Sequence, residues 1–425
     1  MAIRLYFLYI LIILLLLSCR SRNIDNYFKT MNTSELKAAV NKEVTENILS
    51  YWIEKTVDNE NGGFYGEVKN KGQIVKDANR SAVVNMRILW TFANAYRIFK
   101  KDEYKIAAEH AYEYIKKYFV DKDNGGVYWM LDYKGNPIDT KKQSYAQGFA
   151  IYGLAALHRA TGNKEALELA IEIHKLLEEH AFDPAYGGYL EAYTADWKLM
   201  DDLRLSSKEP NEKKTMNTHL HILEPYTELY RSWKDEGLRN QIIGLIRVFI
   251  DHILNKENYH FNLFFEEDWT VKSEEISYGH DIEGSWLLFE AAEVLGDEAL
   301  IQEVGDVAVK MAEATLNEAI QNDGGLVYEG DPNGIIDTDR HWWPQAEAVI
   351  GFYNAYQISG DKKYLDAAIN SWNYIEKYIV DKKFGEWFWL ADKNGNPKRS
   401  EHKVGPWKCP YHNSRTCFEI IERVK

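Results

Sequence analysis

Six short patterns of apolar residues divide the chain into units of similar length. Most begin with a turn that contains paired glycines and continue into aromatic and β-branched residues, a combination that predicts a tight turn followed by a short strand. The patterns recur at intervals of about 60 to 75 residues, as expected for a chain built from structural repeats. They lie at 61–65, 124–128, 186–189, 262–265, 323–328 and 384–388.

Helical stretches fill the intervals between these patterns. Their apolar residues recur every three or four positions, which places them on one face of an α-helix. Eight such stretches are evident, at 88–99, 104–119, 146–160, 166–179, 220–233, 238–254, 282–295 and 346–358. Two helices in each of six units predict twelve helices.

Twelve paired helices can form an open solenoid or a closed ring. A solenoid needs capping repeats at its ends, whereas a ring buries both ends and surrounds one central pocket with its inner helices. We therefore predict an all-α fold, an (α/α)6 barrel of twelve helices with short hairpins at the Gly-Gly turns, over residues 32–425. Several sugar-active enzymes share this fold, which favours carbohydrate chemistry but specifies no reaction.

The N-terminus has the composition of an export signal. Arg4 precedes an unbroken apolar run at 5–17, which is too short to span a bilayer as a helix and suits the core of a signal peptide. The sequence Leu-Leu-Ser-Cys, which ends at Cys19, resembles a bacterial lipobox. We expect a signal peptide at 1–19, a linker at 20–31, and an exported lipoprotein that faces the periplasm of a bacterial envelope. An ordinary secretory signal and an uncleaved anchor are the alternatives.

The net charge and the cysteine content limit the partners that we expect for this chain. The chain has 51 Lys and Arg against 65 Asp and Glu, and its net charge of -14 argues against a nucleic-acid partner. We expect a monomer that contacts a membrane only through its N-terminal lipid. Cys409 and Cys417 are the other two cysteines, and their spacing does not establish a disulfide. The sequence contains no CxxC or Cys/His zinc spacing, so we predict no metal site.

Three motifs with acid–base residues lie at the starts of predicted helices. His280 and Glu283 are three residues apart and therefore share a helix face. Asn217 and His221 are four apart, with a glutamate one turn later. The segment 342–347 reads Trp-Trp-Pro-Gln-Ala-Glu and opens a helix, since proline is tolerated in the first turn.

Two further motifs complete the set. Arg87 interrupts an otherwise apolar helix, and the proline-rich loop 405–413 carries Trp407 and His412. Each motif alone also has a structural explanation: a histidine bonded in the core, an arginine in a structural ion pair, or tryptophans that pack the interior. Most of the motifs, however, lie before or between the glycine turns, where the helices of a barrel converge. This placement favours one shared site.

Together the motifs resemble the cellobiose 2-epimerase family, within the N-acylglucosamine 2-epimerase superfamily. The resemblance runs from about residue 32 to the end and is carried by Arg-Ile-Leu-Trp-Thr-Phe at 87–92, Asn-Thr-His-Leu-His at 217–221, His-Asp-Ile-Glu at 280–283, Trp-Trp-Pro-Gln-Ala-Glu at 342–347 and Gly-Pro-Trp-Lys-Cys-Pro-Tyr-His-Asn at 405–413. It implies an isomerase that inverts carbon 2 of the reducing-end glucose or mannose in a β-1,4-linked disaccharide such as cellobiose or mannobiose.

The resemblance also implies the roles of the residues. Inversion needs one base to remove the proton of carbon 2 and a second to return a proton to the opposite face. His412 is expected to take the proton from the gluco substrate, and His280 to reprotonate carbon 2. By the same resemblance, Glu347 partners His412 and Glu283 partners His280.

The remaining assignments concern the negative charge that forms during the reaction and the contacts with the substrate. Arg87 is expected to stabilise the enediolate oxygen. The residues expected to contact the sugars are Asn217, His221, Trp342, Trp343, Trp407 and Tyr145. The substrate carbonyl carries the charge, so no cofactor is expected, and no glycine-rich dinucleotide fingerprint is present.

Three other functions stay open at this point. One is a monosaccharide 2-epimerase, for example for N-acylglucosamine; the tandem Trp residues and loop 405–413 favour the disaccharide instead. A glycoside hydrolase would use two carboxylates, but the strongest motifs pair His with Glu. A non-catalytic sugar-binding lipoprotein would need the aromatic residues but not two histidines.

Overall fold

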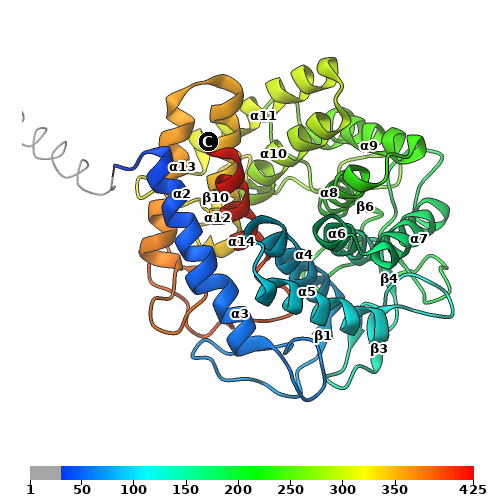
Figure 1. Ribbon diagram of the computed structural model, residues 1–425. Coiled ribbons are helices and arrows are strands. Elements are labelled where there is room, and N and C mark those ends of the chain that lie inside the picture. Colours follow the sequence, from blue (N-terminus) through cyan, green and yellow to red (C-terminus); the bar gives the residue numbers. More distant parts are fainter. Residues whose placement is uncertain (1–29) are drawn as a thin grey trace, which may run out of the picture.

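The computed structural model describes residues 30–425, and the predicted signal peptide with Cys19 lies outside these residues. Twelve helices in the described chain form two concentric rings (Figure 1). The inner ring consists of α4 (Ala82–Phe99), α6 (Ser144–Thr161), α8 (Met216–Ser232), α10 (Tyr278–Leu295), α12 (Trp342–Ser359) and α14 (Tyr411–Arg423). The predicted (α/α)6 barrel is confirmed.

The outer ring covers the inner one. It consists of the continuous helix α2 (Thr33–Lys42), η1 (Glu43–Ile48) and α3 (Leu49–Thr56), then α5 (Asp102–Tyr114) with η2 (Ile115–Phe119), α7 (Lys164–His180), α9 (Glu236–Val248) with η3 (Phe249–Ile253), α11 (Glu298–Glu318), and α13 (Lys362–Tyr374) with η4 (Ile375–Ile379). The η segments are π-helical turns that extend the neighbouring α-helices.

The two rings differ in burial, and the sequence explains why. In α4 every residue from Ala82 to Ala95 is buried, because the helix is covered by neighbours on all sides. The outer helix α7 buries Ala166, Ala170, Ile173 and Leu177, the three- and four-residue spacing of one apolar face.

The first and last helices close the ring. The C-terminal helix α14 packs between the inner helices α12 and α4, and the N-terminal helix α2 packs against its outer side. The sixth helix pair is therefore assembled from the two ends of the described chain, so neither end needs a capping repeat.

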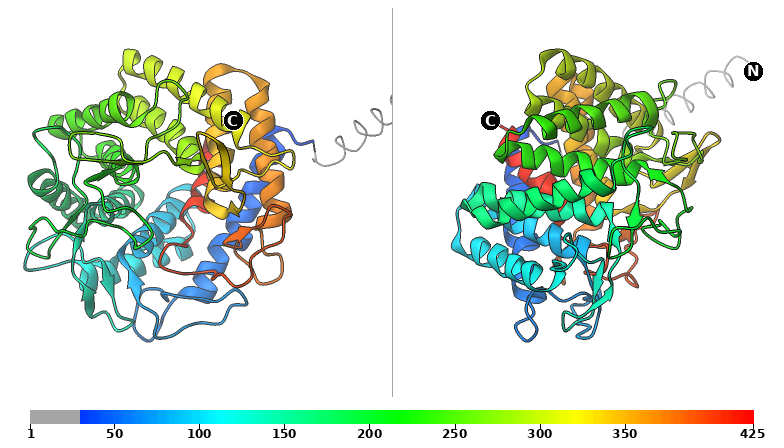
Figure 2. Two further views of the ribbon diagram at one scale, coloured as in Figure 1. Left: turned by 180° about the vertical axis from the view of Figure 1, so that it is seen from behind. Right: turned by 90° about the vertical axis from the view of Figure 1, so that its right-hand side faces the viewer.

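Short antiparallel strands join neighbouring units at one end of the barrel, as the right-hand view of Figure 2 shows. The strand just before an inner helix pairs with the strand that follows the next turn. The strands are β1 (Arg80–Ser81), β2 (Met130–Leu131), β3 (Pro137–Asp139), β4 (Lys142–Gln143), β5 (Ala192–Tyr193), β6 (Lys214–Thr215), β7 (Phe264–Phe265), β8 (Ile276–Ser277), β9 (Glu329–Asp331), β10 (Gly334–Asp337), β11 (Arg340–His341) and β12 (Leu390–Ala391). The inner helices begin at this end.

Each of the six turns is closed by an antiparallel bridge at the end of an outer helix. The fourth turn corrects the sequence prediction: the bridge joins Leu254 to Phe261, so the repeat precedes the predicted segment 262–265. Tyr259 occupies the left-handed position there (φ 62°) that glycine occupies in other turns, for example Gly125 (φ 71°). The missing glycine is why the sequence pattern was misplaced.

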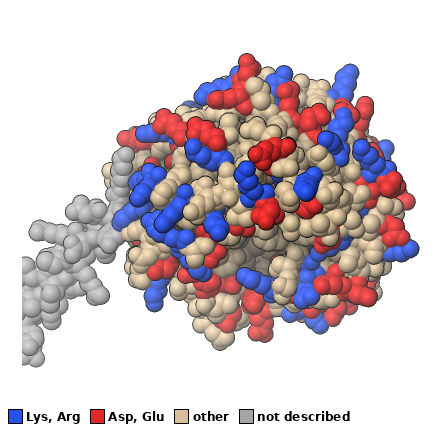
Figure 3. Space-filling model, turned by 90° about the horizontal axis from the view of Figure 1, so that it is seen from below, with Lys and Arg blue, Asp and Glu red and all other residues tan. Residues whose placement is uncertain are grey.

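Buried ion pairs tie several turns to the strands beside them. They join Asp58 to Arg80 (2.5 Å), Asp121 to Lys142 (2.7 Å), Asp183 to Lys214 (2.6 Å) and Asp381 to Lys403 (2.9 Å). Cys409 and Cys417 are buried and free. The face drawn in Figure 3 shows acidic and basic side chains interspersed. Among residues 30–425, no helix is both long and apolar enough to cross a membrane.

Candidate active site

A cavity of about 870 Å³ opens at the strand end of the barrel. This volume lies within the range of ligand-binding pockets. The predicted site residues that line it are Arg87, Tyr145, Asn217, His221, His280, Glu283, Trp342, Trp343, Trp407 and His412. The structure thus brings ten of the eleven predicted residues to one cavity, and the eleventh, Glu347, lies directly behind His412.

The repeat places several of these side chains at equivalent positions. Arg87, His221, Glu283 and Glu347 are each the sixth residue of an inner helix that begins at the strand end. The fourth residue of the same helices has a structural role instead. His219 and Gln345, for example, accept the N–H that follows a glycine turn, at 2.9 and 2.8 Å.

His412 is held by a carboxylate as the resemblance implied. Its Nδ1 lies 2.7 Å from Glu347 Oε1, which leaves Nε2 for the cavity. Both groups are buried, with 5% and 0% exposed. Burial and the charges of Arg87 and Arg415 hold the pKa of His412 well below its ordinary value, so the imidazole is neutral and able to accept a proton.

His280 has a different partner from the one expected. Its Nδ1 lies 2.7 Å from Ser277 Oγ, whereas Glu283 bonds Arg415. Ser277 precedes α10 and is three residues from His280, so a hydroxyl at the helix start does the orienting that was assigned to a carboxylate one turn later. Burial and the nearby His221 lower the pKa of His280 to about 3.

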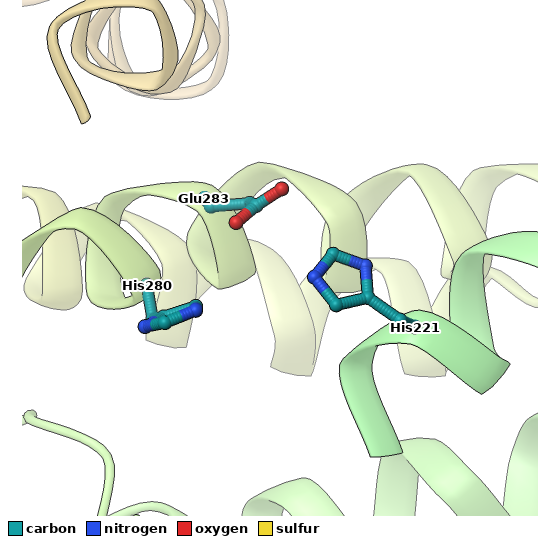
Figure 4. Close-up of side chains that lie close together, drawn as sticks. All are labelled: His221, His280 and Glu283. Carbon is teal, nitrogen blue, oxygen red and sulfur yellow. The ribbon is translucent and has the colours of Figure 1, made fainter. Parts of the chain in front are cut away.

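Glu283 lies beside two histidines and does not set the orientation of either ring. Figure 4 shows Glu283 and His280 on the same helix, with the ring of His221 directed toward the carboxylate. Ligand atoms of the three groups lie within 4.8 Å of one another. Burial and the charge of Glu347 raise the pKa of Glu283 to about 7. Its Oε2 has no hydrogen-bond partner among residues 30–425.

His221 sits at a kink of α8. Pro225 has no N–H to bond the carbonyl of residue 221, and the helix departs from regular geometry at that residue (φ −87°, ψ 15°). The freed carbonyl approaches α6 at Gly148, where a Cβ would lie 2.2 Å from His221 O. His221 Nδ1 bonds Glu224 Oε1 at 2.8 Å, so a carboxylate of the same helix orients the ring.

Sequence reasoning missed the residue at the centre of the site. Arg415 bonds Glu224 (2.5 Å), Glu347 (2.6 Å) and Glu283, and also the hydroxyl of Tyr411. One guanidinium therefore links three buried carboxylates from three helices. Its position three residues after His412, on the same helix, was the one available signal.

Arg87 is placed differently. Its Nη2 donates to Tyr145 OH at 2.9 Å, and its guanidinium lies 4.2 Å from the centre of the Phe149 ring and 4.8 Å from that of Tyr411. It forms no ion pair with any residue of the described chain. Arg87 thus presents an unneutralised cation to the cavity.

The aromatic residues line the space above the histidines. The Trp343 ring lies 4.7 Å from His280 and 5.6 Å from His412, centre to centre. Trp407 contacts Tyr145 edge-on, whereas Trp342 is only 4% exposed and packs against Trp389, which sequence reasoning did not single out. Trp389 also lines the cavity.

Two sets of site residues have the spacing of metal ligands. They are His221 with His280 and Glu283, and Glu283 with Glu347 and His412. In each set a histidine nitrogen already bonds a carboxylate, and Glu283 and Glu347 both bond Arg415. The absence of a metal stays a prediction.

Comparison with known proteins agrees with this geometry. A family model described as N-acylglucosamine 2-epimerase matches residues 63–415. The cellobiose 2-epimerase of Bacteroides fragilis is 50% identical over 387 residues, which are 91% of this chain and 98% of that protein. The chain belongs to the N-acylglucosamine 2-epimerase family, in its cellobiose 2-epimerase branch.

Two other members of the family show how similarity differs between its branches. The structure of cellobiose 2-epimerase from Bacillus thermoamylovorans is 40% identical, with a TM-score of 0.88 over 93% of this chain and all of that one. The N-acylglucosamine 2-epimerase of Mus musculus is 24% identical over 91% of each chain.

Proposed function

We propose that this family member is a 2-epimerase that inverts carbon 2 of the reducing-end glucose or mannose in a β-1,4-linked disaccharide. The observation that carries the proposal is a pair of neutral imidazoles, the half-buried His280 and the buried His412, that come from different helices and lie on one cavity. The higher identity to cellobiose 2-epimerases than to an N-acylglucosamine 2-epimerase favours a disaccharide over a monosaccharide. Because the cavity is lined by one chain, we propose that it works as a monomer.

The first chemical step opens the sugar ring, since carbon 2 is not acidic until a carbonyl is next to it. His280 takes the proton of the anomeric hydroxyl, and the protonated carboxyl of Glu283 gives its proton to the ring oxygen. The bond between carbon 1 and the ring oxygen breaks, and an aldehyde forms at carbon 1. The raised pKa of Glu283 suits a general acid near neutral pH.

The second step inverts carbon 2. His412 removes the proton, and the electron pair moves into the carbonyl to give an enediolate, whose negative oxygen faces Arg87. His280 returns to the opposite face the proton that it took from the anomeric hydroxyl. On ring closure Glu283 regains the ring-oxygen proton and His412 gives its proton to O1, so the site recovers its starting protonation. The histidines exchange roles in the reverse direction.

The sugar contacts follow from the walls of the cavity. Trp343 lies beside both bases and suits a stacking platform for the reducing-end ring, because a pyranose presents an apolar face. Trp407 suits the distal ring. Asn217 Oδ1 has no partner within residues 30–425 and is available to a sugar hydroxyl, beside His221.

Hydrolysis fits the site less well. A glycoside hydrolase places one carboxylate on each side of the scissile bond. Glu283 and Glu347 instead share the Arg415 guanidinium and lie beside His412, with their oxygens within 4.8 Å of the same imidazole nitrogen.

The test is to incubate the protein separately with cellobiose, β-1,4-mannobiose and N-acetylglucosamine and to identify the products by NMR. We expect glucosyl-mannose or mannosyl-glucose, and the faster reaction identifies the preferred disaccharide. Free glucose or mannose as the main product would mean hydrolysis, and turnover of N-acetylglucosamine alone would mean a monosaccharide epimerase.

We also propose that the protein is an exported lipoprotein of a bacterial envelope, anchored through Cys19 and facing the periplasm. The support is the apolar run and the Leu-Leu-Ser-Cys junction in the sequence. Cys19→Ala should release the protein from membranes or block its processing. An unchanged membrane fraction together with an unchanged N-terminus would contradict the proposal.

A further inference from the structure

The sixth turn differs from the first three at one position. Glu386 stands where those turns have their second glycine, and its φ of 59° is close to the 64° of Gly63 and the 68° of Gly126. This left-handed conformation is unfavourable for a residue with a Cβ. Glycine would adopt it without strain, so the retained glutamate side chain points to a role of its own.

The Glu386 carboxylate replaces a contact that an inner helix makes in other units. After the second turn, the N–H of Val127 bonds Gln147 Oε1 of α6 at 2.8 Å. In the sixth unit the equivalent N–H, that of Trp387, bonds Glu386 Oε1 at 2.7 Å. The helix α14 is therefore not required to satisfy this N–H.

The same carboxylate holds the segment that carries two site residues. Glu386 Oε1 accepts from Lys408 Nζ at 2.9 Å and from Asn413 Nδ2 at 3.0 Å. Lys408 directly follows Trp407, and Asn413 directly follows His412. The segment is thus tied to one buried oxygen at both of its ends.

The N-terminal helix fixes this clamp from the other side. Trp52 Nε1 of α3 donates to Glu386 Oε2 at 2.7 Å, and the Glu386 N–H donates to Asn47 Oδ1 at 2.8 Å. Glu386, Lys408, Asn413 and Trp52 are all 0% exposed. No water competes for these bonds, so the position of the carboxylate is set by the protein alone.

We propose that Glu386 is a positioning residue for catalysis, which holds segment 407–413 so that Trp407 and His412 keep their places in the cavity. The proposal rests on the epimerase function proposed above. Without the carboxylate, Lys408 loses its charged partner and Asn413 its acceptor, while the other units keep their contacts. The segment then gains freedom, and the Nε2 of His412 is less often aligned with carbon 2.

Two variants of Glu386 separate this role from a general need for stability. Glu386→Gln keeps the shape but removes the charge that pairs with Lys408. Glu386→Gly restores the residue of the first three turns, which relieves the backbone and removes all the side-chain bonds. Asp183→Asn is the matched control, because it breaks an equally buried ion pair, with Lys214, at the turn before α8, across the ring from α14.

The readouts are hydrogen exchange measured by mass spectrometry, kcat and KM on cellobiose, and the temperature of thermal unfolding. For both Glu386 variants we expect faster exchange confined to 407–413 and a kcat/KM lower by about 10- to 100-fold, the effect of a misplaced base. Asp183→Asn should lower the unfolding temperature and leave kcat/KM and exchange at 407–413 unchanged.

The outcomes are distinct. Wild-type protein that is inactive on the tested sugars would contradict the proposed function, and the exchange data would still test the clamp. Unchanged exchange at 407–413, or wild-type kcat/KM in both variants, would overturn the positioning role. Failure of both variants to fold would also overturn it, because the whole barrel would then depend on Glu386.

Discussion

The two ends of the barrel contain arginines with different arrangements of charge. At the end away from the strands, every one of four arginines pairs with a carboxylate: Arg97 with Glu422 (2.6 Å), Arg159 with Glu228 (2.6 Å), Arg231 with Glu290 (2.7 Å) and Arg423 with Glu419 (2.8 Å). Glu228 also lies 3.4 Å from Arg231. At the strand end, three carboxylates share Arg415, and Arg87 has none.

The ion pairs at the far end therefore stabilise the fold, whereas the charges at the strand end support the proposed chemistry. These pairs neutralise their charges near the C-terminal ends of the inner helices, where a positive side chain is also favoured by the helix dipole. Three of them join neighbouring inner helices, and the pair of Arg423 with Glu419 lies within α14. At the strand end, the unmatched charges act on the groups to which the proton transfers are assigned. Burial and the neighbouring carboxylates raise the pKa of Glu283. Burial lowers the pKa of His280 and His412, and the unpaired Arg87 adds to that effect.

The largest expected effect comes from removing either base. His412→Asn and His280→Asn should each reduce epimerisation of cellobiose by about 10²- to 10⁴-fold. Circular dichroism should show an unchanged fold, since neither ring belongs to the apolar core. A variant of either residue with near-normal kcat would exclude that residue from the proton transfers.

A smaller loss is expected from Arg87→Met, with Arg97→Met as its counterpart at the other end. Losing the cation that faces the enediolate should lower kcat/KM by about 10²- to 10³-fold. No carboxylate is left unpaired, so the free energy of unfolding should hardly change. Arg97→Met breaks a partly exposed ion pair and should cost at most about 1 kcal/mol of stability, with normal kcat/KM. Equal activity losses in the two variants would remove the contrast between the ends.

The smallest expected effect concerns how kcat/KM depends on pH. His412 must be neutral to accept a proton. Because its pKa lies well below 6.5, the imidazole is still neutral at pH 6.5, so the acid limb of kcat/KM should lie below pH 6.5. Glu283 must be protonated to open the ring, so kcat/KM should fall as the pH rises through about 7. An acid limb above pH 6.5, or full activity retained well above pH 7, would contradict these assignments.

The sequence predicted the repeat, and therefore the barrel, because apolar periodicity and turn glycines are local signals. It also predicted that these side chains meet at one site, and most of them line one cavity because they lie near the starts of inner helices. Where the glycines are absent, at Tyr259 and His260, the same reasoning misplaced the fourth turn.

The partners of these side chains could not be predicted with the same success. Ser277 rather than Glu283 bonds His280, because rotamers and neighbouring helices decide which acceptor is reached. Arg415 bonds Glu224, 191 positions away, and Glu386 bonds Trp52, 334 positions away. Such contacts exist only once the ring has closed, and no local pattern encodes them.

Isotope incorporation tests the two-base reaction most directly. When the protein converts cellobiose in heavy water, the product should carry deuterium at carbon 2 of the reducing-end residue, because the returned proton comes from an exchangeable imidazole. Deuterium should enter the product faster than the recovered substrate, since a different histidine returns the proton. The glycosidic bond should stay whole. Epimerised product without deuterium would mean hydride transfer or bond rotation, and would contradict the roles of His280 and His412.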